Sequence, residues 1–380
     1  MTCQRNIGLA CLAGLISSIS LASGQSSTQP GTPMGERVTP ALSSVAADPA
    51  AREPLKVLAY LVSGEWTMQS QSPTPMREVW RFGPGKHSLV AFTHGRDGEG
   101  ELWREIKVLF WDAARGEVRM LWINPFSRTV MDGNVTMEGV HPVATLRAHQ
   151  AGGLRLLQTR WTQEGENAHR VQLLEDRGDG RYSNLATWDY TRAETMTPME
   201  AAPPEVRTPQ DRLAMLSVLV GSAGAGTDEI GGTGPARVRS WSANGDAEGA
   251  WAVSVGRQPR LDVAWIPFAN VVHTRLVTPT TDGAGQALMD MYFYHHTGNN
   301  RVQCLALSQD GGVYQGVVTS TADGGFEVTL GDEGQGSEER HIVRVSKGKK
   351  TSTMHMEVLL QEGLEDRVML KGTLTSAEVR

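Results

Sequence analysis

The chain has few cysteines and no long apolar run beyond its amino terminus. Three cysteines occur in 380 residues, and Cys3 and Cys11 both lie in the first eleven positions. A mature chain that begins after residue 24 keeps Cys304 alone, so it forms no internal disulfide even though a route out of the cytoplasm would permit one. Cys304 falls on an apolar alternation, which predicts a small core residue rather than a reactive thiol.

Motifs for the common catalytic and cofactor chemistries are also missing. We find no His-Glu-x-x-His, Cys-x-x-Cys, Gly-x-Ser-x-Gly or phosphate-binding Gly-Lys-Ser/Thr pattern. The adjacent His295 and His296 point to opposite faces of a predicted strand, so they are poorly placed to share a metal ion. We therefore predict no catalytic residue and no metal site, and an enzyme ranks third among the functions considered.

Charge of one sign is not concentrated in the chain. The formal net charge is −6. Removal of residues 1–24 takes away Arg5 and no acid, which leaves 35 basic and 42 acidic residues, or −7. This balance gives no basic footprint, so we predict no nucleic-acid partner.

The amino terminus has the pattern of an export signal. Arg5 precedes an apolar stretch over residues 7–21, and small residues follow at 22–24. The stretch is too short and too rich in serine for a membrane span, so we expect no transmembrane segment in the mature chain. We predict a signal peptide over residues 1–24, a periplasmic or extracellular location, and a disordered Ser/Thr/Pro-rich tether over residues 25–50.

Two long stretches of the sequence repeat one another. Residues 97–146 and 282–330 both open on Asp-Gly, pass through an aromatic strand end and a polar turn, and close on Thr-Leu, with offsets of 183 to 185. A length of 380 residues also suits two domains of about 150 residues each. The repeat therefore predicts a duplicated domain.

Alternating side chains and tight turns predict that this domain is all-β. Turns such as Gly83-Pro84-Gly85 and Asp132-Gly133 separate short alternating runs. A meander of this many strands would curl, and closure into a barrel removes its exposed edges. After the entry at Gly64-Glu65-Trp66, nine strands are predicted in the first copy: 77–82, 88–96, 103–111, 118–123, 129–137, 143–147, 154–161, 169–175 and 182–190.

A short helix is predicted before each barrel. Apolar residues at helical spacing over 55–62 lead into Gly64, and the same spacing recurs over 213–220. We predict an all-β chain of two tandem up-and-down antiparallel barrels, each preceded by a short helix. The predicted boundaries are 51–192 for the first barrel, 193–210 for a Pro-rich linker and 211–380 for the second, diverged barrel.

The entry and end of the first copy resemble the calycin plan of lipocalins and nitrobindin-like barrels. The residues that carry this resemblance are Gly64-Glu65-Trp66 and Arg192, and the order of later Trp and Gly residues is similar to that of uncharacterised secreted bacterial barrel proteins. The resemblance implies that Trp66 plugs one end of the barrel while Arg192 packs across its ring. The second copy has no Trp after Gly221, so either Trp241 or Trp251 plugs it, or it is a degenerate partner of the first.

Strand parity in the first copy suggests a ligand-binding face. Ile106, Val108 and Phe110 share one face of their strand, and we expect this face, together with Trp122, to line the barrel interior. Arg104, at the end of the face, either anchors an acidic ligand or lies in water at the rim. The first hypothesis is thus an exported, non-catalytic protein that binds a small apolar or amphipathic molecule, chiefly in the first barrel.

Two alternatives remain open at this stage. The resemblance to nitrobindin-like barrels, which hold haem through a histidine, makes His169 and His355 haem candidates because they stand at roughly matching positions; the competing interpretation is a pair of half-exposed strand histidines, with no cofactor. The other alternative is a protein interaction module in which both barrels are filled and their outer surfaces meet another envelope protein.

Overall fold

The computed structural model describes residues 52–62, 64–68, 76–96, 102–124, 129–150, 153–178, 180–194, 211–220, 228–229, 236–237, 239–243, 259–266, 269–278, 285–331, 339–350, 352–362 and 365–377. The predicted signal peptide, the tether and residues 195–210 of the predicted linker lie outside this part of the chain.

Barrel 1 is a closed antiparallel barrel of ten strands, β1 to β10. Each strand pairs with the next along the chain, and β1 also pairs with β10 to close the ring. The ten strands match the predicted entry strand and the nine that follow it. They are β1 (Glu65–Met68), β2 (Met76–Phe82), β3 (Ser88–Arg96), β4 (Leu102–Asp112), β5 (Glu117–Asn124), β6 (Thr129–Glu138), β7 (His141–Gln150), β8 (Gly153–Gln163), β9 (Ala168–Asp176) and β10 (Tyr182–Arg192).

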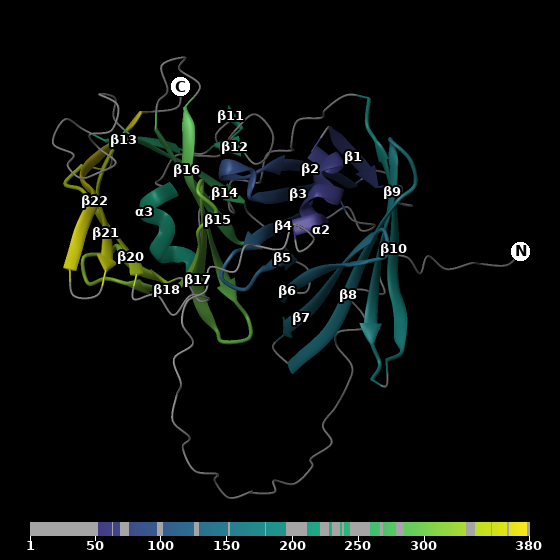
Figure 1. Ribbon diagram of the computed structural model, residues 1–380. Coiled ribbons are helices and arrows are strands. Elements are labelled where there is room, and N and C mark those ends of the chain that lie inside the picture. The colour runs from purple at the N-terminus through teal and green to yellow at the C-terminus, as the bar shows by residue number, and fades with distance from the viewer. Residues whose placement is uncertain are drawn as a thin grey trace, which may run out of the picture.

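Barrel 2 has the same closed meander of ten strands and lies beside barrel 1 (Figure 1). The predicted all-β fold of two tandem up-and-down barrels is therefore confirmed. A separate two-stranded sheet, β11 (Asp228–Glu229) with β12 (Ala236–Arg237), precedes barrel 2. The barrel strands are β13 (Arg239–Ala243), β14 (Arg260–Ile266), β15 (Val271–Thr278), β16 (Gln286–His296), β17 (Arg301–Ser308), β18 (Val313–Ser320), β19 (Phe326–Gly331), β20 (Glu339–Lys347), β21 (Thr353–Glu362) and β22 (Glu365–Ala377).

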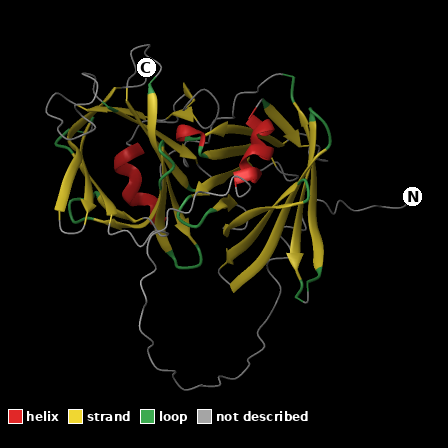
Figure 2. Ribbon diagram, in the orientation of Figure 1, coloured by secondary structure: helices red, strands yellow, loops and turns green. Residues whose placement is uncertain are grey.

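A short helical segment precedes each barrel, as predicted (Figure 2). The helical residues Leu58, Leu61, Leu216 and Leu219 are buried in the barrel cores, because each segment turns its apolar side toward its barrel. No helix in the described ranges is long and apolar enough to cross a membrane. The segments are α2 (Glu53–Leu58) with η2 (Ala59–Val62), and η5 (Asp211–Leu216) with α3 (Ser217–Val220); a further turn, η3 (Pro84–Lys86), joins β2 to β3.

One tryptophan ties each helical segment to its barrel. Trp66 Nε1 donates a hydrogen bond to the carbonyl of Leu61 at 2.8 Å, and Trp241 Nε1 donates to the carbonyl of Leu219 at 2.8 Å. Five residues separate the first pair and 22 the second, so barrel 2 makes the same contact across an inserted segment. Of the two plugs considered for the second copy, Trp241 occupies the position, whereas Trp251 lies outside the described residues.

The predicted turn at Asp132-Gly133 is wrong, because both residues lie within β6. Instead, Gly133 is one of two glycines at matching positions that let neighbouring strands approach closely. A Cβ on Gly133 of β6 would lie 1.8 Å from the carbonyl oxygen of Thr145, and one on Gly316 of β18 would lie 2.1 Å from that of Thr329. No side chain fits at such distances, so both copies need glycine here. This shared constraint explains why glycine recurs at the matching position in the two halves of the sequence.

Apolar side chains on the outer surfaces of the two barrels form one buried cluster, which we call the junction. Val108 and Phe110 on β4 contact the same cluster as Tyr292 on β16 and Leu305 on β17, and none of them is more than 2% exposed. Burial of this apolar area on both sides holds the barrels together. The junction consists of Val90, Phe92, Ile106, Val108, Phe110, Leu121, Ile123 and Val130 from barrel 1, and Ile266, Ala269, Val271, Tyr292, Tyr294, Leu305 and Leu307 from barrel 2.

The expectation that Ile106, Val108 and Phe110 line the interior of barrel 1 is therefore wrong. They face outward into the junction, while Leu109 and Trp111 on the opposite face belong to the interior cluster. Both faces of β4 are buried, so alternation alone could not identify the inner one.

A buried carboxylate adds a polar contact to the junction. Asp290, which has no exposed surface, accepts two hydrogen bonds from Arg275 at 2.7 and 2.8 Å. Arg81 of barrel 1 approaches the same carboxylate at 3.7 Å. Burial by itself raises the pKa of Asp290. The neighbouring cations, Arg275 first, together have the larger opposite effect, so the pKa is lowered overall and the group stays ionised. This contact links the two barrels across the junction in addition to the apolar packing.

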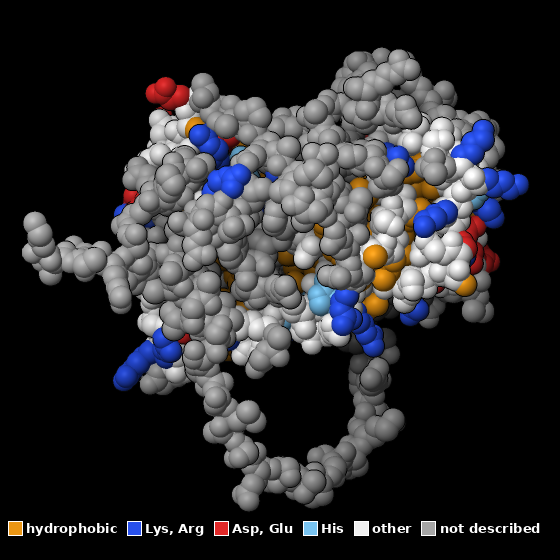
Figure 3. Space-filling view, turned by 180° about the vertical axis from the view of Figure 1, so that it is seen from behind, with side chains coloured by type: hydrophobic (Ala, Val, Ile, Leu, Met, Phe, Trp, Pro, Cys, Tyr) orange, Lys and Arg blue, Asp and Glu red, His pale blue; other side chains and the backbone are white. Residues whose placement is uncertain are grey.

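On the face drawn in Figure 3, Lys and Arg side chains are scattered over both barrels. The described side chains on this face do not form a continuous basic surface of the kind that phosphate backbones require.

Replacement of each plug tryptophan by phenylalanine tests its hydrogen bond. We expect Trp66→Phe and Trp241→Phe each to lower the free energy of unfolding by about 1–3 kcal/mol, because a buried carbonyl loses its donor. Trp111→Phe is the matched control, since Trp111 is equally buried but its indole N–H has no hydrogen-bond partner among the described residues. Urea unfolding measures all three, and an equal cost for Trp111→Phe would contradict the assignment.

Candidate functional site

Three charged side chains lie inside barrel 1. Glu78 on β2 and Glu105 and Lys107 on β4 are 1%, 5% and 4% exposed. Lys107 Nζ forms an ion pair with Glu78 Oε2 and lies 2.9 Å from Glu105 Oε1. The lysine thus bridges two carboxylates in the core.

Polar side chains on the neighbouring strands complete this charged cluster. Trp80 Nε1 and Thr93 Oγ1 donate to Glu78 at 2.6 and 2.9 Å. Trp122 Nε1 donates to Glu105 at 3.1 Å. Buried ions are tolerated only when such partners replace water. The two indole rings therefore pack in the apolar core and also donate hydrogen bonds to the buried carboxylates.

The pKa shifts follow from this arrangement. Burial raises the pKa of Glu78, but Lys107 and the donors outweigh burial and lower it overall. Burial lowers the pKa of Lys107, whereas Glu105 and Glu78 raise it well above its usual value. Glu78 and Lys107 therefore remain charged at neutral pH, and the ion pair persists inside the barrel.

His169 on β9 lies at the helical end of this cluster. It is 1% exposed, stacks on Tyr190 with ring centroids 4.7 Å apart, and meets the edge of Trp66 at 4.5 Å. Neither ring nitrogen has a hydrogen-bond partner in the described part of the chain. Burial lowers its pKa to about 4, so the imidazole is neutral at physiological pH.

Barrel 2 has no equivalent of the charged cluster. The strand register places Leu261, Met289 and Met291 at the positions that Glu78, Glu105 and Lys107 occupy in barrel 1. All three lie in the apolar core of barrel 2. At these three positions barrel 2 closes without charge, so among the described residues the cluster belongs to barrel 1.

A pocket of about 300 Å³ lies at the helical end of barrel 1. Its wall combines the helical segment with the ends of β7 and β8 and the turn after β8. Tyr60 joins it to the interior, because its ring lies 5.8 Å from that of Trp66 and 6.0 Å from that of His169. The lining residues are Val57, Leu58, Tyr60, Val140, His141, Pro142, Trp161, Gln163 and Gly165.

A larger and more polar pocket, of about 710 Å³, lies on barrel 2. Arg344, Glu357 and Lys371 line it and pair with one another, with Arg344 and Lys371 each 3.0 Å from the Glu357 carboxylate. Arg344 also pairs with Glu327 at 2.6 Å, so each of these three charges has an ion-pair partner and the pocket offers less unpaired chemistry than its size suggests.

The predicted site residues fall in three separate places. Trp122 lies in the interior of barrel 1, whereas Arg104 lies on the outer face of β4 and is 6% exposed. Arg104 pairs in register with His94. The Arg192 guanidinium lies over the ring of Trp66, 4.6 Å from its centroid, in the arrangement that the calycin resemblance implies.

His169 and His355 do not occupy matching positions. His169 pairs with Tyr190, two residues before the partner of Trp66, but the equivalent pair in barrel 2 is Met354 with Leu374. His355 is the next residue, so it faces outward, where it contacts the Thr373 hydroxyl at 3.2 Å. The premise of a matched histidine pair is therefore wrong by one residue.

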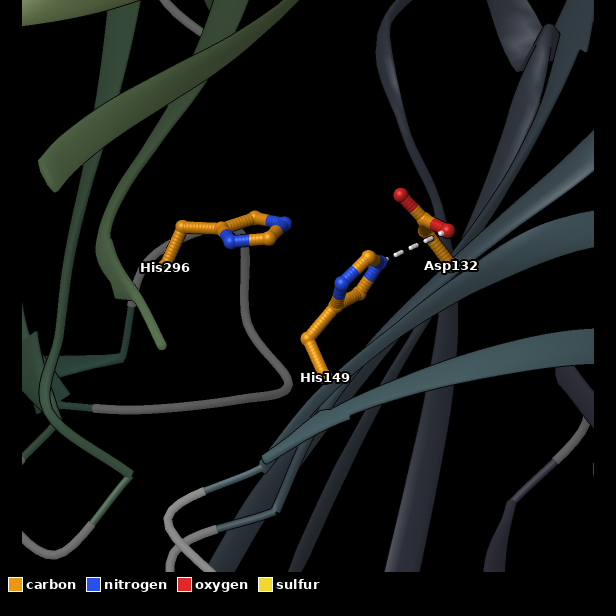
Figure 4. Close-up of side chains that lie close together, drawn as sticks. All are labelled: Asp132, His149 and His296. Atoms are coloured by element: carbon orange, nitrogen blue, oxygen red, sulfur yellow. Dashed lines mark hydrogen bonds and ion pairs between the residues drawn. The ribbon is translucent and has the colours of Figure 1, made fainter. Parts of the chain in front are cut away.

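One group of metal-ligand side chains converges outside barrel 1, beside the junction. Asp132 on β6, His149 on β7 and His296 at the end of β16 place one donor atom each within 4.8 Å of the others (Figure 4). Sequence reasoning missed this group because its third member comes from the other barrel. The expectation that His295 and His296 point apart is consistent with it, since only His296 joins the group.

Comparisons with known proteins identify no family. No protein-family model matches the chain, and the search of curated proteins gave no match. Among solved structures, the dehydratase domain of the polyketide PpsC from Mycobacterium tuberculosis is 10% identical, with 83% of this chain and 97% of that chain covered and a TM-score of 0.12. The CurJ dehydratase is 11% identical, with 72% and 92% covered and a TM-score of 0.12. TM-scores this low carry no argument about fold or activity.

Replacement of the buried lysine tests the charged cluster. We expect Lys107→Met to lower the free energy of unfolding by about 3–5 kcal/mol, because two buried carboxylates lose their cation. The triple variant Glu78→Leu, Glu105→Met, Lys107→Met copies barrel 2 and should recover much of that loss.

The pH dependence of Lys107→Met gives a second readout of the same variant. In the wild type the pKa of Glu78 is lower in the folded than in the unfolded chain. This difference stabilises the fold at pH values above the unfolded pKa, and the stabilisation is lost as pH falls through the folded pKa. In Lys107→Met the largest opposing cause is lost, so burial outweighs the remaining Trp80 hydrogen bond and the pKa of Glu78 rises. Stability should then increase as pH falls from 7 to 5. Denaturant titrations that show the wild-type slope would contradict the ion pair.

Titration of His169 should weaken the fold in acid. The unfolded histidine takes up a proton near pH 6.5, but the folded one resists it until about pH 4. Stability is therefore complete above pH 6.5 and falls toward pH 4, by up to about 3 kcal/mol. His169→Phe should remove the part of the acid destabilisation that comes from His169. Burial likewise lowers the pKa of His94 to about 4, so His94→Phe should remove a second part. Unfolding curves at several pH values measure both.

Proposed function

We propose that the protein is an exported, non-catalytic binding protein that holds a small amphipathic molecule in the pocket at the helical end of barrel 1. The observation that carries the proposal is the pocket itself. Its volume of about 300 Å³ is at the lower end of the range for small-molecule sites, about 300–1,000 Å³. A compact ring compound suits it better than a long acyl chain.

The lining supports an amphipathic ligand. Leu58, Pro142 and Trp161 provide an apolar wall, while His141 and Gln163 provide polar atoms near the rim. Tyr60 stands between this wall and the interior, with burial raising its pKa so that the phenol stays protonated. A bound ring could pack on Trp161 and exchange hydrogen bonds with Gln163 or His141.

The rigid interior beneath the pocket supports binding with little reorganisation. The Tyr60 ring packs edge-on against Trp66, and Trp66 is tied by its hydrogen bond to Leu61 of the same helical segment. A preformed site avoids part of the ordering cost of binding. The calycin resemblance, supported by the Arg192–Trp66 contact, agrees with a binding role, and we propose a calycin-like origin for both barrels.

Haem is the alternative ligand, and the contacts of the two candidate histidines argue against it. His169 is enclosed by the rings of Tyr60, Trp66 and Tyr190. His355 faces outward beside Thr373. Haem can be added to the wild type and to a His169→Phe variant. If the two Soret spectra are the same, haem binding through His169 is rejected.

Obstruction of the pocket rim tests the proposed site. We expect some small aromatic alcohols or acids from a compound library to raise the melting temperature of the full chain. Val140→Trp, at an exposed rim position, should weaken the best of them by about tenfold or more, because the added ring enters the ligand volume. Leu154→Trp is the matched control, an exposed apolar residue outside the pocket lining, and it should bind as wild type. Equal affinity in both variants, or a library that stabilises nothing, would reject the site.

A further inference from the structure

We infer that Asp132, His149 and His296 form a divalent metal site that bridges the two barrels. Asp132 and His149 are neighbours on the outer face of barrel 1, on strands β6 and β7, whose register places Asp132 beside Arg147 and His149 beside Val130. His296 reaches them from the end of β16 in barrel 2 (Figure 4). The inference is independent of the small-molecule pocket, because it uses different residues on the outer face of barrel 1.

The donor set has the chemistry of a zinc-type site. Two imidazoles and one carboxylate are ligands that Zn²⁺ and similar divalent transition metals bind well. His296 Nδ1 accepts a hydrogen bond from the Gly298 backbone N–H at 3.2 Å, so the neutral ring carries its proton on Nε2. Coordination of a metal through Nε2 therefore requires the tautomer with the proton on Nδ1 and the loss of this hydrogen bond.

The donor atoms lie near one another but farther apart than in a loaded site. The donor atoms lie within 4.8 Å of one another, and His149 Nε2 is 3.4 Å from Asp132 Oδ1. Ligand atoms around a tetrahedral Zn²⁺ are about 3.3 Å apart, given bonds of about 2.0–2.1 Å. Small side-chain rotations of His296 would close the remaining difference. Three protein ligands leave a fourth position for water or another ligand.

The backbone around the histidines is fixed by contacts between the barrels. Thr297 Oγ1 donates a hydrogen bond to the carbonyl of His149 at 2.6 Å. A Cβ on Gly298 would lie 2.7 Å from His149 Nδ1, so glycine lets the turn after β16 approach the imidazole. The turn therefore holds His296 against His149, with ring centroids 4.5 Å apart and the ring planes tilted by 56°.

A surface ion pair is the competing explanation for part of this geometry. Arg147 Nε lies 3.1 Å from Asp132 Oδ1, and its side chain is 54% exposed. An exposed pair of this kind contributes little to stability, and it does not account for His296, which is 8% exposed and comes from the other barrel. A metal ion would displace Arg147 or use the second carboxylate oxygen.

The position of the site couples metal binding to the packing of the two barrels. An ion that binds only the docked arrangement stabilises it in proportion to its concentration relative to the dissociation constant. We therefore expect Zn²⁺ to raise the melting temperature of the full chain, and removal of the ion by a chelator to reverse the rise.

Calorimetric titration of the untagged full chain with ZnCl₂ tests the site. We expect one tight equivalent, and a loss of affinity of about tenfold or more in His149→Ala and in His296→Ala, because loss of a ligand costs no less than loss of an outer-sphere partner. His295→Ala is the matched control, since His295 is the adjacent residue but contacts Asn300 instead at 3.1 Å. It should bind as wild type.

Two further measurements keep the result clear if an alanine variant folds poorly. Asp132→Asn keeps the shape of the side chain and should weaken Zn²⁺ while leaving the circular dichroism spectrum unchanged. The visible spectrum of the Co²⁺-loaded wild type should show a low-symmetry, four- or five-coordinate site. Absence of tight Zn²⁺ binding, or equal affinity in His295→Ala and His296→Ala, would overturn the inference.

Discussion

Contact between the outer faces of the two barrels is the constraint on which the rest of the structure depends. In a single solvated barrel the outward side chains of β4 would be polar, but here Val108 and Phe110 are buried against barrel 2. The matching residues of β16, Tyr292 and Tyr294, lie 184 positions later and belong to the same cluster. Equivalent faces of the two copies thus meet each other, as in a two-fold symmetric dimer whose subunits have been joined into one chain.

This arrangement leaves the interiors free to diverge. Barrel 1 holds an ion pair among indole donors, whereas barrel 2 holds leucine and methionine at the same positions. A buried ion pair contributes little net stability compared with apolar packing. Trp66 pairs in register with Glu78 of this cluster, and its ring contacts Tyr60, which lines the pocket beside the helical segment. The polar interior and the candidate binding site are therefore parts of one packed unit.

The junction also brings together groups that neither copy could assemble alone. Asp290 of barrel 2 is neutralised partly by Arg81 of barrel 1, and His296 meets Asp132 and His149 in the same way. The buried carboxylate is fully surrounded, whereas the histidine group is partly open to solvent. The Asp290–Arg81 contact is suited to linking the two barrels, and the histidine group is accessible to an ion.

The sequence by itself determined the all-β class, the two copies, the strand order and the helical entry to each barrel. These follow from local signals: side chains alternate with period two, turns carry Gly and Asp, and the offset between the copies stays nearly constant. The contact of Arg192 with Trp66 was also expected, but only from the resemblance to the calycin plan.

Only the tertiary structure decided which face of each strand is inside. Ile106 and Lys107 are adjacent, and hydrophobicity alone places the isoleucine inward, but a second barrel covers it while Glu78 and Glu105 neutralise the lysine. The histidine group depends likewise on a contact between copies that no spacing in the chain encodes. Burial depends on everything that packs against a residue, and periodicity reports only which residues share a face.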